Sequence, residues 1–416
     1  KYVVFTDPIT GAKRYYHQSG PIYGEASAPV RWEDTLAPWL VNELGFIRGD
    51  NEPCVFYHPE RDLLVITYVD DVMLDGYDED INWFHNCISG RFDCKDLTYL
   101  SAGSSIDYIG MDLIMDSTRI YISMARYIGN MLKLFDMANS KPASTPIDKP
   151  IDTDSPALPA AQRRQFMTGL GMLGWLVNTA RPDLAYAHSR IAQHAANPTE
   201  ASWHALMHVM RYCRGAAHWC LSVKLNRDDM DVNKIIGDWQ PKHDDWECYS
   251  DSDLGGNAEI QNKRRSQNGA IIMRGGAPQY WHSKVSSVAF AHADIGEAHA
   301  DIASAAAEVY AASNATHEML HFSYVVEEAG MTFPLPARLL IDNTAAIIFA
   351  DNSCFKSKLK HIDCRQEWVK TLRDKNIIVP AYVSTNENVA DIFTKILSTQ
   401  TFTYLRDKIM FEYYHM

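Results

Sequence analysis

The strongest constraint on the fold is the order of predicted strands and helices after residue 246. Three apolar strands come first, a long alanine-rich helix follows, and strands and helices then alternate. The predicted strands cover residues 246–250, 269–274, 279–283, 337–341 and 377–384, and the predicted helices cover residues 298–328, 344–350, 362–374 and a segment that begins at Ala390. This order predicts a mixed five-stranded sheet with helices packed on it.

The first half of the chain is predicted to contain a hairpin and then mainly helices. Apolar strands at 63–69 and 72–74 flank Asp70 and Asp71, which places two acids at the hairpin tip. Residues 141–159 contain five prolines and are expected to form an extended linker. Helices are expected from residue 162 to about residue 217, with one starting at Asn197-Pro198. The expected fold class is therefore α/β, in the broad α+β sense.

An acidic residue stands at four separate places in the predicted elements of the C-terminal half. They are Asp251 after the first strand, Glu308 on the alanine-rich helix, Asp342 at a strand end and Asp391 at the start of the last helix. Each alone has an ordinary explanation, since turns, solvated helix faces, helix caps and first helical turns all recruit acids. Together they favour a site in which four carboxylates hold two divalent metal ions and water cleaves a phosphodiester.

Asp70 and Asp71 form a second candidate metal site. Two adjacent carboxylates between apolar strands are costly unless a cation or water satisfies them. Asp is also common in turns, so ordinary turn chemistry is the alternative. Hard oxygen ligands of this kind suit Mg²⁺. We therefore expect two Mg²⁺ ions at each site, with Mn²⁺ as a substitute.

The net charge of −13 argues at first against a nucleic-acid partner, but the charge is uneven. Residues 351–410 hold 10 Lys and Arg against 7 Asp and Glu. Five residues in two basic segments are candidate contacts for nucleic-acid phosphates: Lys263, Arg264, Arg265, Lys360 and His361. A solvated basic loop is the alternative for the second segment.

Several function classes lack their sequence signatures. The eight cysteines form no CxxC pair, which makes a zinc site an unfavoured hypothesis and points to a reducing compartment. No P-loop or GxSxG motif occurs. Neither a signal peptide nor a membrane span is visible. We expect an intracellular protein with no membrane partner, found in a cytoplasmic particle, the nucleus or both, and not secreted.

Short strings in a fixed order along the chain resemble the Pol polyprotein of copia-type LTR retrotransposons. In the first half they are YGEASAPVRW at 23–32, YVDD at 68–71, YIGMD at 108–112, KPASTP at 141–146 and TARPDLAY at 179–186. In the second half they lie at 249–257, 304–311, 342–347, 360–365 and 390–397. The resemblance covers nearly the whole chain.

The resemblance implies three parts. Residues 1–115 would be a partial reverse transcriptase palm, residues 116–245 the thumb and connection with the linker at 141–159, and residues 246–416 a ribonuclease H-like domain. It implies that Asp251, Glu308, Asp342 and Asp391 are catalytic metal ligands of the ribonuclease H, and that Asp70 and Asp71 belong to the polymerase site. The implied partners are RNA–DNA hybrid and primer-template nucleic acid, together with upstream Pol segments or a second copy of the chain.

The sequence also departs from the family pattern. Leu254 stands in place of a Trp, Ala306 in place of the first Glu of a Glu pair, and Ala26 in place of a basic residue; the segment 285–303 is longer than usual. The family's earlier polymerase Asp and its fingers have no counterpart before Tyr23, so we expect no polymerase activity from this chain alone. The alternatives to an active ribonuclease H are a catalytically inactive remnant that at most binds nucleic acid, and a ribonuclease H that a host uses for another task.

Overall fold

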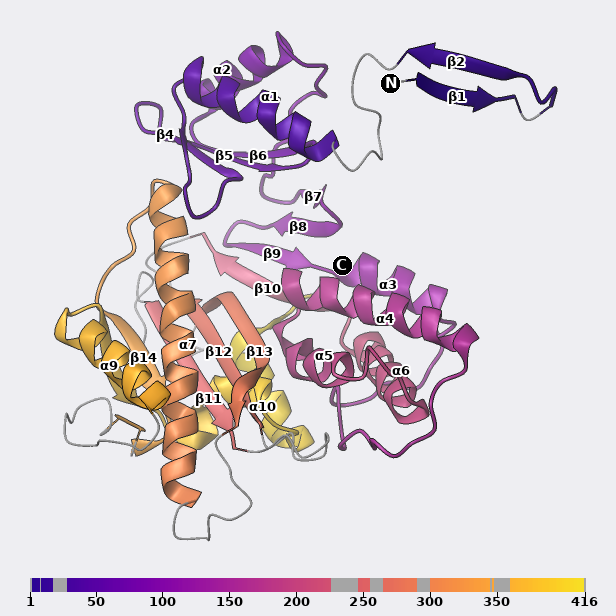
Figure 1. The fold of residues 1–416 in the computed structure, drawn as a ribbon. Coiled ribbons are helices and arrows are strands. Elements are labelled where there is room, and N and C mark those ends of the chain that lie inside the picture. The colour runs from indigo at the N-terminus through magenta and orange to yellow at the C-terminus, as the bar shows by residue number, and fades with distance from the viewer. Residues whose placement is uncertain are drawn as a thin grey trace. The chain divides into compact units, whose positions relative to one another are not determined.

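The computed structural model describes residues 2–7, 9–17, 28–225, 246–254, 265–289, 300–344, 346–347 and 360–414. The chain divides into two compact units: residues 1–97 with 323–332, and residues 98–322 with 333–416. Helices and strands mix in the chain, so the predicted fold class is confirmed (Figure 1). Among the described residues, no helix combines the length and the hydrophobicity that crossing a bilayer requires.

The first unit is built on a four-stranded antiparallel sheet. Its strands, in spatial order, are β3 (Ile47–Arg48), β4 (Val55–His58), β5 (Leu63–Tyr68) and β6 (Asp71–Asp75). Leu63 and Val65 alternate along β5 and point to one face, where they pack in one apolar core with α1 (Ala28–Asn42) and α2 (Asp78–Ser89). A separate hairpin contains β1 (Tyr2–Thr6) and β2 (Lys13–His17).

The predicted hairpin around the two adjacent acids is confirmed. Tyr68 pairs with Asp71, so the loop consists of Val69 and Asp70. Val69 has a φ of +54°, a conformation that is rare for a β-branched residue. The indole Nε1 of Trp32 donates a hydrogen bond to the carbonyl oxygen of Val69 at 2.6 Å. A tertiary contact thus holds a loop whose backbone is locally unfavourable.

The second unit contains an antiparallel sheet covered by helices. In spatial order its strands are β16 (Phe411–Glu412), β10 (Trp219–Lys224), β9 (Arg119–Ser123), β8 (Met111–Met115) and β7 (Ser105–Tyr108). The helices beside it are α3 (Ala125–Leu134), α4 (Ala160–Thr179), η1 (Pro182–Leu184), α5 (Ala185–Ala192) and α6 (Glu200–Gly215). The predicted helix start at Asn197-Pro198 is wrong, because Thr199 is the cap: its hydroxyl accepts from the Ser202 N–H and the Ser202 side chain bonds back.

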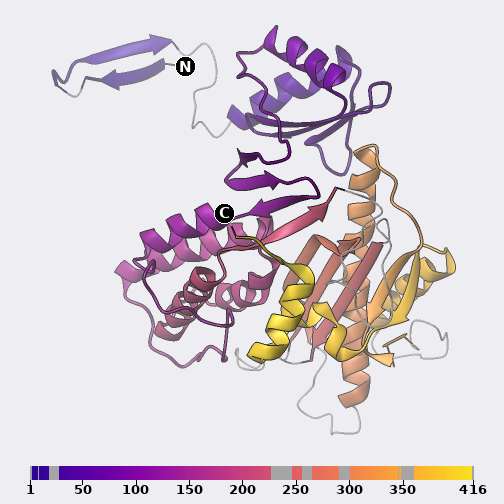
Figure 2. The ribbon, with the colours of Figure 1, turned by 180° about the vertical axis from the view of Figure 1, so that it is seen from behind.

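A second sheet in this unit confirms the predicted five-stranded mixed architecture. Its strands, in spatial order, are β13 (Ala277–Ala289), β12 (Arg265–Arg274), β11 (Trp246–Asp253), β14 (Ala337–Ile341) and β15 (Ile378–Tyr382). The first three strands pair antiparallel, and the last two join by parallel pairing. Helix α7 (Ala300–Glu328) crosses one face (Figure 1), and α10 (Thr399–Ile409) lies on the face seen from behind (Figure 2).

The predicted helix that begins at Ala390 is not present as predicted. Residues Val389–Phe393 form the short 3₁₀ helix η5, and α10 starts only at Thr399. The reason is helix capping. The Asn388 side chain accepts a hydrogen bond from the Ala390 N–H at the start of η5, and the Ser398 side chain accepts one from the Thr401 N–H at the start of α10. The predicted helix at 344–350 lies partly outside the described residues, whereas that at 362–374 is α9 (Lys360–Asp374).

One apolar core joins the helices to the mixed sheet. Leu173 and Leu176 of α4 belong to the same buried cluster as Tyr249 of β11 and Ile271 of β12. Two polar contacts reinforce this junction: Trp281 Nε1 donates to the carbonyl oxygen of Val177 at 2.8 Å, and Gln267 Nε2 donates to Ser189 Oγ at 3.0 Å. The α4–α5 segment is therefore fixed against the strands that carry the acidic cluster described next. The domain boundaries at 115 and 245 stay predictions.

Candidate metal centre

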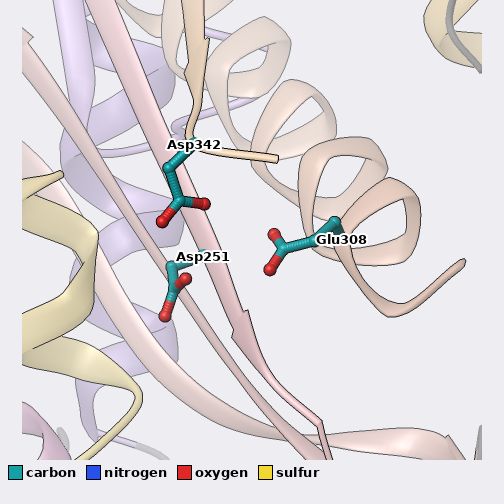
Figure 3. A group of neighbouring side chains, drawn as sticks. All are labelled: Asp251, Glu308 and Asp342. Carbon is teal, nitrogen blue, oxygen red and sulfur yellow. The ribbon is translucent and has the colours of Figure 1, made fainter. Parts of the chain in front are cut away.

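Three of the four predicted acids meet at one end of the mixed sheet. Asp251 lies in β11, Glu308 on α7, and Asp342 directly after β14. Each offers a carboxylate oxygen within 4.8 Å of the others. Their side chains turn toward one another from three different elements (Figure 3). Asp251 and Glu308 are only 2% and 5% exposed, so repulsion among these carboxylates is little screened by water.

The fourth acid, Asp391, belongs to the same electrostatic cluster. It lies in η5 and is 4% exposed. Asn388 Nδ2 donates a hydrogen bond to the carbonyl oxygen of Ser250 at 3.1 Å, which ties the start of η5 to β11 beside Asp251. Gly269 of β12 lets η5 approach closely, because a Cβ there would lie 2.6 Å from the Cβ of Phe393. Sequence-distant elements thus place Asp391 by specific contacts.

Burial and repulsion between carboxylates raise the pKa values of Glu308, Asp342 and Asp391. Burial, followed by the charges of Asp251 and Asp342, holds the pKa of Glu308 well above its ordinary value. Burial and Asp251 raise the pKa of Asp391 to about 7, and the same two causes raise the pKa of Asp342. Such shifts are what a divalent cation would reverse, because it favours the ionised carboxylates.

Glu308 brings an unsatisfied oxygen into the cluster. The backbone N–H of Ser252 bonds to the Glu308 carboxylate, but Glu308 Oε2 is buried and has no partner among the described residues. An unsatisfied buried oxygen is costly. The donor set also fits, since carboxylate oxygens are the ligands that Mg²⁺ and Mn²⁺ prefer. The residues present therefore suit divalent cations held by Asp251, Glu308, Asp342 and Asp391.

Sequence reasoning missed two side chains that touch the acids. Thr394 donates its hydroxyl to Asp251 Oδ2. Lys395 Nζ lies 2.9 Å from Asp391 Oδ1 and 3.6 Å from Asp251 Oδ2. Burial alone would lower the pKa of Lys395, but these two carboxylates raise it. The four-residue spacing between Asp391 and Lys395 was a visible signal, because residues four apart in a helical segment lie on one face.

The first candidate site is less complete. Asp70 and Asp71 are exposed at the β5–β6 hairpin. Within the ranges that the structure describes, no third acid, histidine or cysteine joins them in a group of three potential ligands. The predicted contribution of these two acids to a polymerase site stays a prediction.

Most side chains of the predicted phosphate contacts lie outside the described residues. Lys263 and Arg264 lie outside the described residues, as do residues 23–27, 255–264 and 290–299 of the segments singled out in the sequence. Arg265 opens β12 and is half-buried. Lys360 and His361 are the first residues of α9, and their side chains are outside the described set. Their role in binding nucleic acid stays a prediction.

Comparison with known proteins agrees with the motifs. Residues 10–149 match the family model of reverse transcriptase (RNA-dependent DNA polymerase). The chain is 25% identical over 401 residues to the retrovirus-related Pol polyprotein from transposon TNT 1-94 of Nicotiana tabacum, covering 93% of this chain and 27% of that protein. It is 27% identical over 399 residues to the Pol polyprotein from transposon RE1 of Arabidopsis thaliana, covering 93% of this chain and 24% of that protein. The chain is thus similar to retrotransposon Pol polyproteins over nearly its whole length.

The chain spans about a quarter of the length of the curated relatives it matches. The resemblance to copia-type Pol polyproteins is thereby confirmed, and residues 10–149 fall in the reverse transcriptase domain. Among solved structures, it is similar to a foamy viral protease-reverse transcriptase in complex with dsDNA, with a TM-score of 0.43 and 10% identity over 92% of this chain and 63% of that one. The acidic cluster lies outside residues 10–149.

Proposed function

We propose that the C-terminal part of this Pol chain is a ribonuclease H that cleaves the RNA strand of RNA–DNA hybrids with two divalent cations. The observation that carries the proposal is the convergence of Asp251, Glu308 and Asp342 from a strand, a helix and a strand end. Asp391 is linked to Asp251 through the ammonium of Lys395, which lies near both. Ordinary turn or capping chemistry requires each acid separately but gives no reason for their convergence.

Each carboxylate has a separate task in this proposal. Asp251 on β11, which Thr394 orients, and Glu308 on α7, whose second oxygen has no donor among the described residues, would bind the cations. Asp342 and Asp391 would complete the ligand set. Bound Mg²⁺ or Mn²⁺ would activate water and stabilise the leaving oxygen. The protein supplies fixed, little-hydrated ligands, because the strands and η5 set their positions before substrate arrives.

The proposed substrate is recognised by shape. A hybrid duplex is distinguished by its groove geometry and 2′-hydroxyls more than by base sequence. Lys263, Arg264, Arg265, Lys360 and His361 remain our proposed phosphate contacts. The proposal includes an intracellular location, in a cytoplasmic particle or the nucleus. It also leaves room for upstream Pol segments or a second copy as partners.

The test is cleavage of a hybrid labelled on its RNA strand by the purified chain in Mg²⁺ and in Mn²⁺. We expect cleavage, and a loss of about 100-fold or more in Asp342→Asn, since removing a group that stabilises transition-state charge typically costs that much. Asp374→Asn is the matched control, because Asp374 is exposed on α9 and pairs with Arg373. Absence of cleavage at any concentration of either ion would favour an inactive remnant.

The polymerase role of the hairpin is a second candidate. The match of residues 10–149 to the reverse transcriptase family favours it, and Asp70 and Asp71 would supply its metal ligands. Because we expect no polymerase activity from this chain alone, the test is primer extension on an RNA template by a longer Pol protein that contains this chain, compared with its Asp71→Asn variant. Extension that survives Asp71→Asn would contradict the assignment.

A further inference from the structure

Lys395 occupies a position inside the acidic cluster that a cation would compete for. Its ammonium bridges Asp391 and Asp251 at 2.9 and 3.6 Å, and its side chain is 34% exposed. A divalent cation bound by the same carboxylates would stand close to this ammonium, and like charges at such separations repel strongly in a partly buried site. The Lys395 ammonium would therefore compete with a divalent cation for Asp251 and Asp391.

A fifth acid lies beside the cluster without a ligand role. Asp253 follows Asp251 by two residues along β11, so both side chains point to the same face of the sheet. Burial raises the pKa of Asp253, and the two cations that counteract this are Lys395 and Arg190. Asp253 is thus near enough to Lys395 for the charge of the ammonium to act on the pKa of Asp253.

Arg190 reaches this place from the helical segment. It lies on α5 and is 5% exposed. The preceding residue, Ser189, accepts a hydrogen bond from Gln267 of β12, which fixes α5 against the sheet. Arg190 therefore brings a second positive charge near Asp253, from a helix outside the mixed sheet.

We propose that Lys395 is a tethered counterion whose ammonium lies between Asp251 and Asp391 until a second divalent cation displaces it toward Asp253. This inference rests on the proposed two-cation function. It makes Lys395 a positioning residue that sets the affinity for the second cation. In the cation-free chain, the lysine offsets the repulsion between the two acids; in the loaded chain, Asp253 offsets the charge of the lysine.

The first experiment measures Mn²⁺ binding to the metal-free full chain, with free Mn²⁺ counted by electron paramagnetic resonance. We expect Lys395→Met to bind the second Mn²⁺ at least about tenfold more tightly than wild type, since a charge a few ångströms away changes ionic equilibria by that order. Lys395→Arg keeps the charge and should bind like wild type. Lys284→Met is the matched control, because Lys284 pairs with Glu318 of α7 and not with the cluster.

A double-mutant cycle then tests the acceptor. Asp253→Asn should weaken the second Mn²⁺ site several-fold in the wild-type chain and change it little in the Lys395→Met chain, because no displaced ammonium then needs a partner. An equal weakening in both backgrounds would show that Asp253 acts only as a nearby negative charge, and would overturn its assigned role. Circular dichroism on each variant confirms that the compared chains are folded.

The outcomes separate this inference from the nuclease proposal. Binding of two Mn²⁺ ions and hybrid cleavage by wild type, with no gain of affinity in Lys395→Met, overturns the counterion role alone. Failure of wild type to bind any Mn²⁺, with Asp251→Asn behaving the same, overturns the two-cation function and the counterion role together.

Discussion

At the scale of single residues, Glu308, Asp342 and Asp391 are held in an environment that raises their pKa values. Glu308 shows this most clearly, since it is buried, faces Asp251 and Asp342, and has one oxygen without a hydrogen-bond partner among the described residues. Native proteins retain such costly groups mainly at functional sites, where a ligand compensates them. The residue-scale predictions concern the stability of the metal-free chain.

Replacing Glu308 by Gln should stabilise the metal-free chain and remove its response to Mg²⁺. The neutral amide ends the repulsion with Asp251 and Asp342, and the gain should be about 1–3 kcal/mol, the usual cost of a poorly satisfied buried group. Urea unfolding in EDTA and in Mg²⁺ measures both effects. Glu367→Gln on the exposed side of α9 is the control and should change neither quantity. A destabilised metal-free variant would contradict the prediction.

Asp391 should make the metal-free chain less stable as pH rises. Its pKa is about 7 when folded and about 4 when unfolded, so the folded state binds the extra proton in this window and loses stability as pH increases. The wild-type unfolding free energy minus that of Asp391→Asn should therefore fall between pH 4 and pH 7 in EDTA. Saturating Mg²⁺ should abolish the fall. A difference that rises with pH would refute the assigned sign.

At the scale of elements, loops and short helices decide where the acids stand. The long helices and the strands of the mixed sheet follow from apolar periodicity, and the sequence predicted most of them within a few residues, whereas it predicted none of β7, β8, β9 and β10. The segment after Asn388 was predicted poorly, because a helix-like pattern there is interrupted by two caps that act through local hydrogen bonds. The contribution of Lys395 was also missed, since its partners Asp251 and Asp391 lie on different elements.

Gly269 should be intolerant of a side chain. An added Cβ would lie 2.6 Å from Phe393 and 2.9 Å from the carbonyl oxygen of Ala390, which pushes η5 away from β12. Gly269→Ala should cost about 1–3 kcal/mol of stability and weaken Mg²⁺ binding through Asp391. Gly171→Ala, on α4 with open space around it, is the matched control and should stabilise by up to about 1 kcal/mol. Thermal unfolding with and without Mg²⁺ measures both.

The hairpin that carries Asp70 and Asp71 should gain stability when its strain is relieved. Val69 adopts a positive φ that costs an L residue about 1–2 kcal/mol, whereas Gly adopts it freely but loses more backbone entropy on folding. Val69→Gly should therefore stabilise the first unit by up to about 1 kcal/mol. Hydrogen exchange at β5 and β6 reports the change, and faster exchange than in wild type would refute it.

At the scale of the whole second unit, helices and mixed sheet share one core. The sequence did not reveal this, because a composition shift near residue 245 resembles a domain boundary while packing between distant segments leaves no local pattern. The fold class and the four acids could be predicted from periodicity and motif order. The role of α5 beside the acidic cluster could not.

A cavity in α4 should therefore weaken the sheet as well. Leu173 is fully buried in the shared core, and Leu173→Ala should cost about 2–5 kcal/mol. Hydrogen exchange should accelerate together in α4 and β12. Met167→Ala, at an exposed position on the same helix, is the control and should alter neither. Faster exchange confined to α4 would show that the two parts unfold independently.

The shared core has a consequence for how such elements diversify. Recombination between α6 and β11 would combine α4 and α5 from one parent with the mixed sheet of another. The contacts of Trp281 with Val177 and of Gln267 with Ser189 would then be made by residues from different parents. Viable chimaeras should inherit these two helices and the sheet from the same ancestor. The segment of α4 and α5 and the mixed sheet should accordingly share one genealogy.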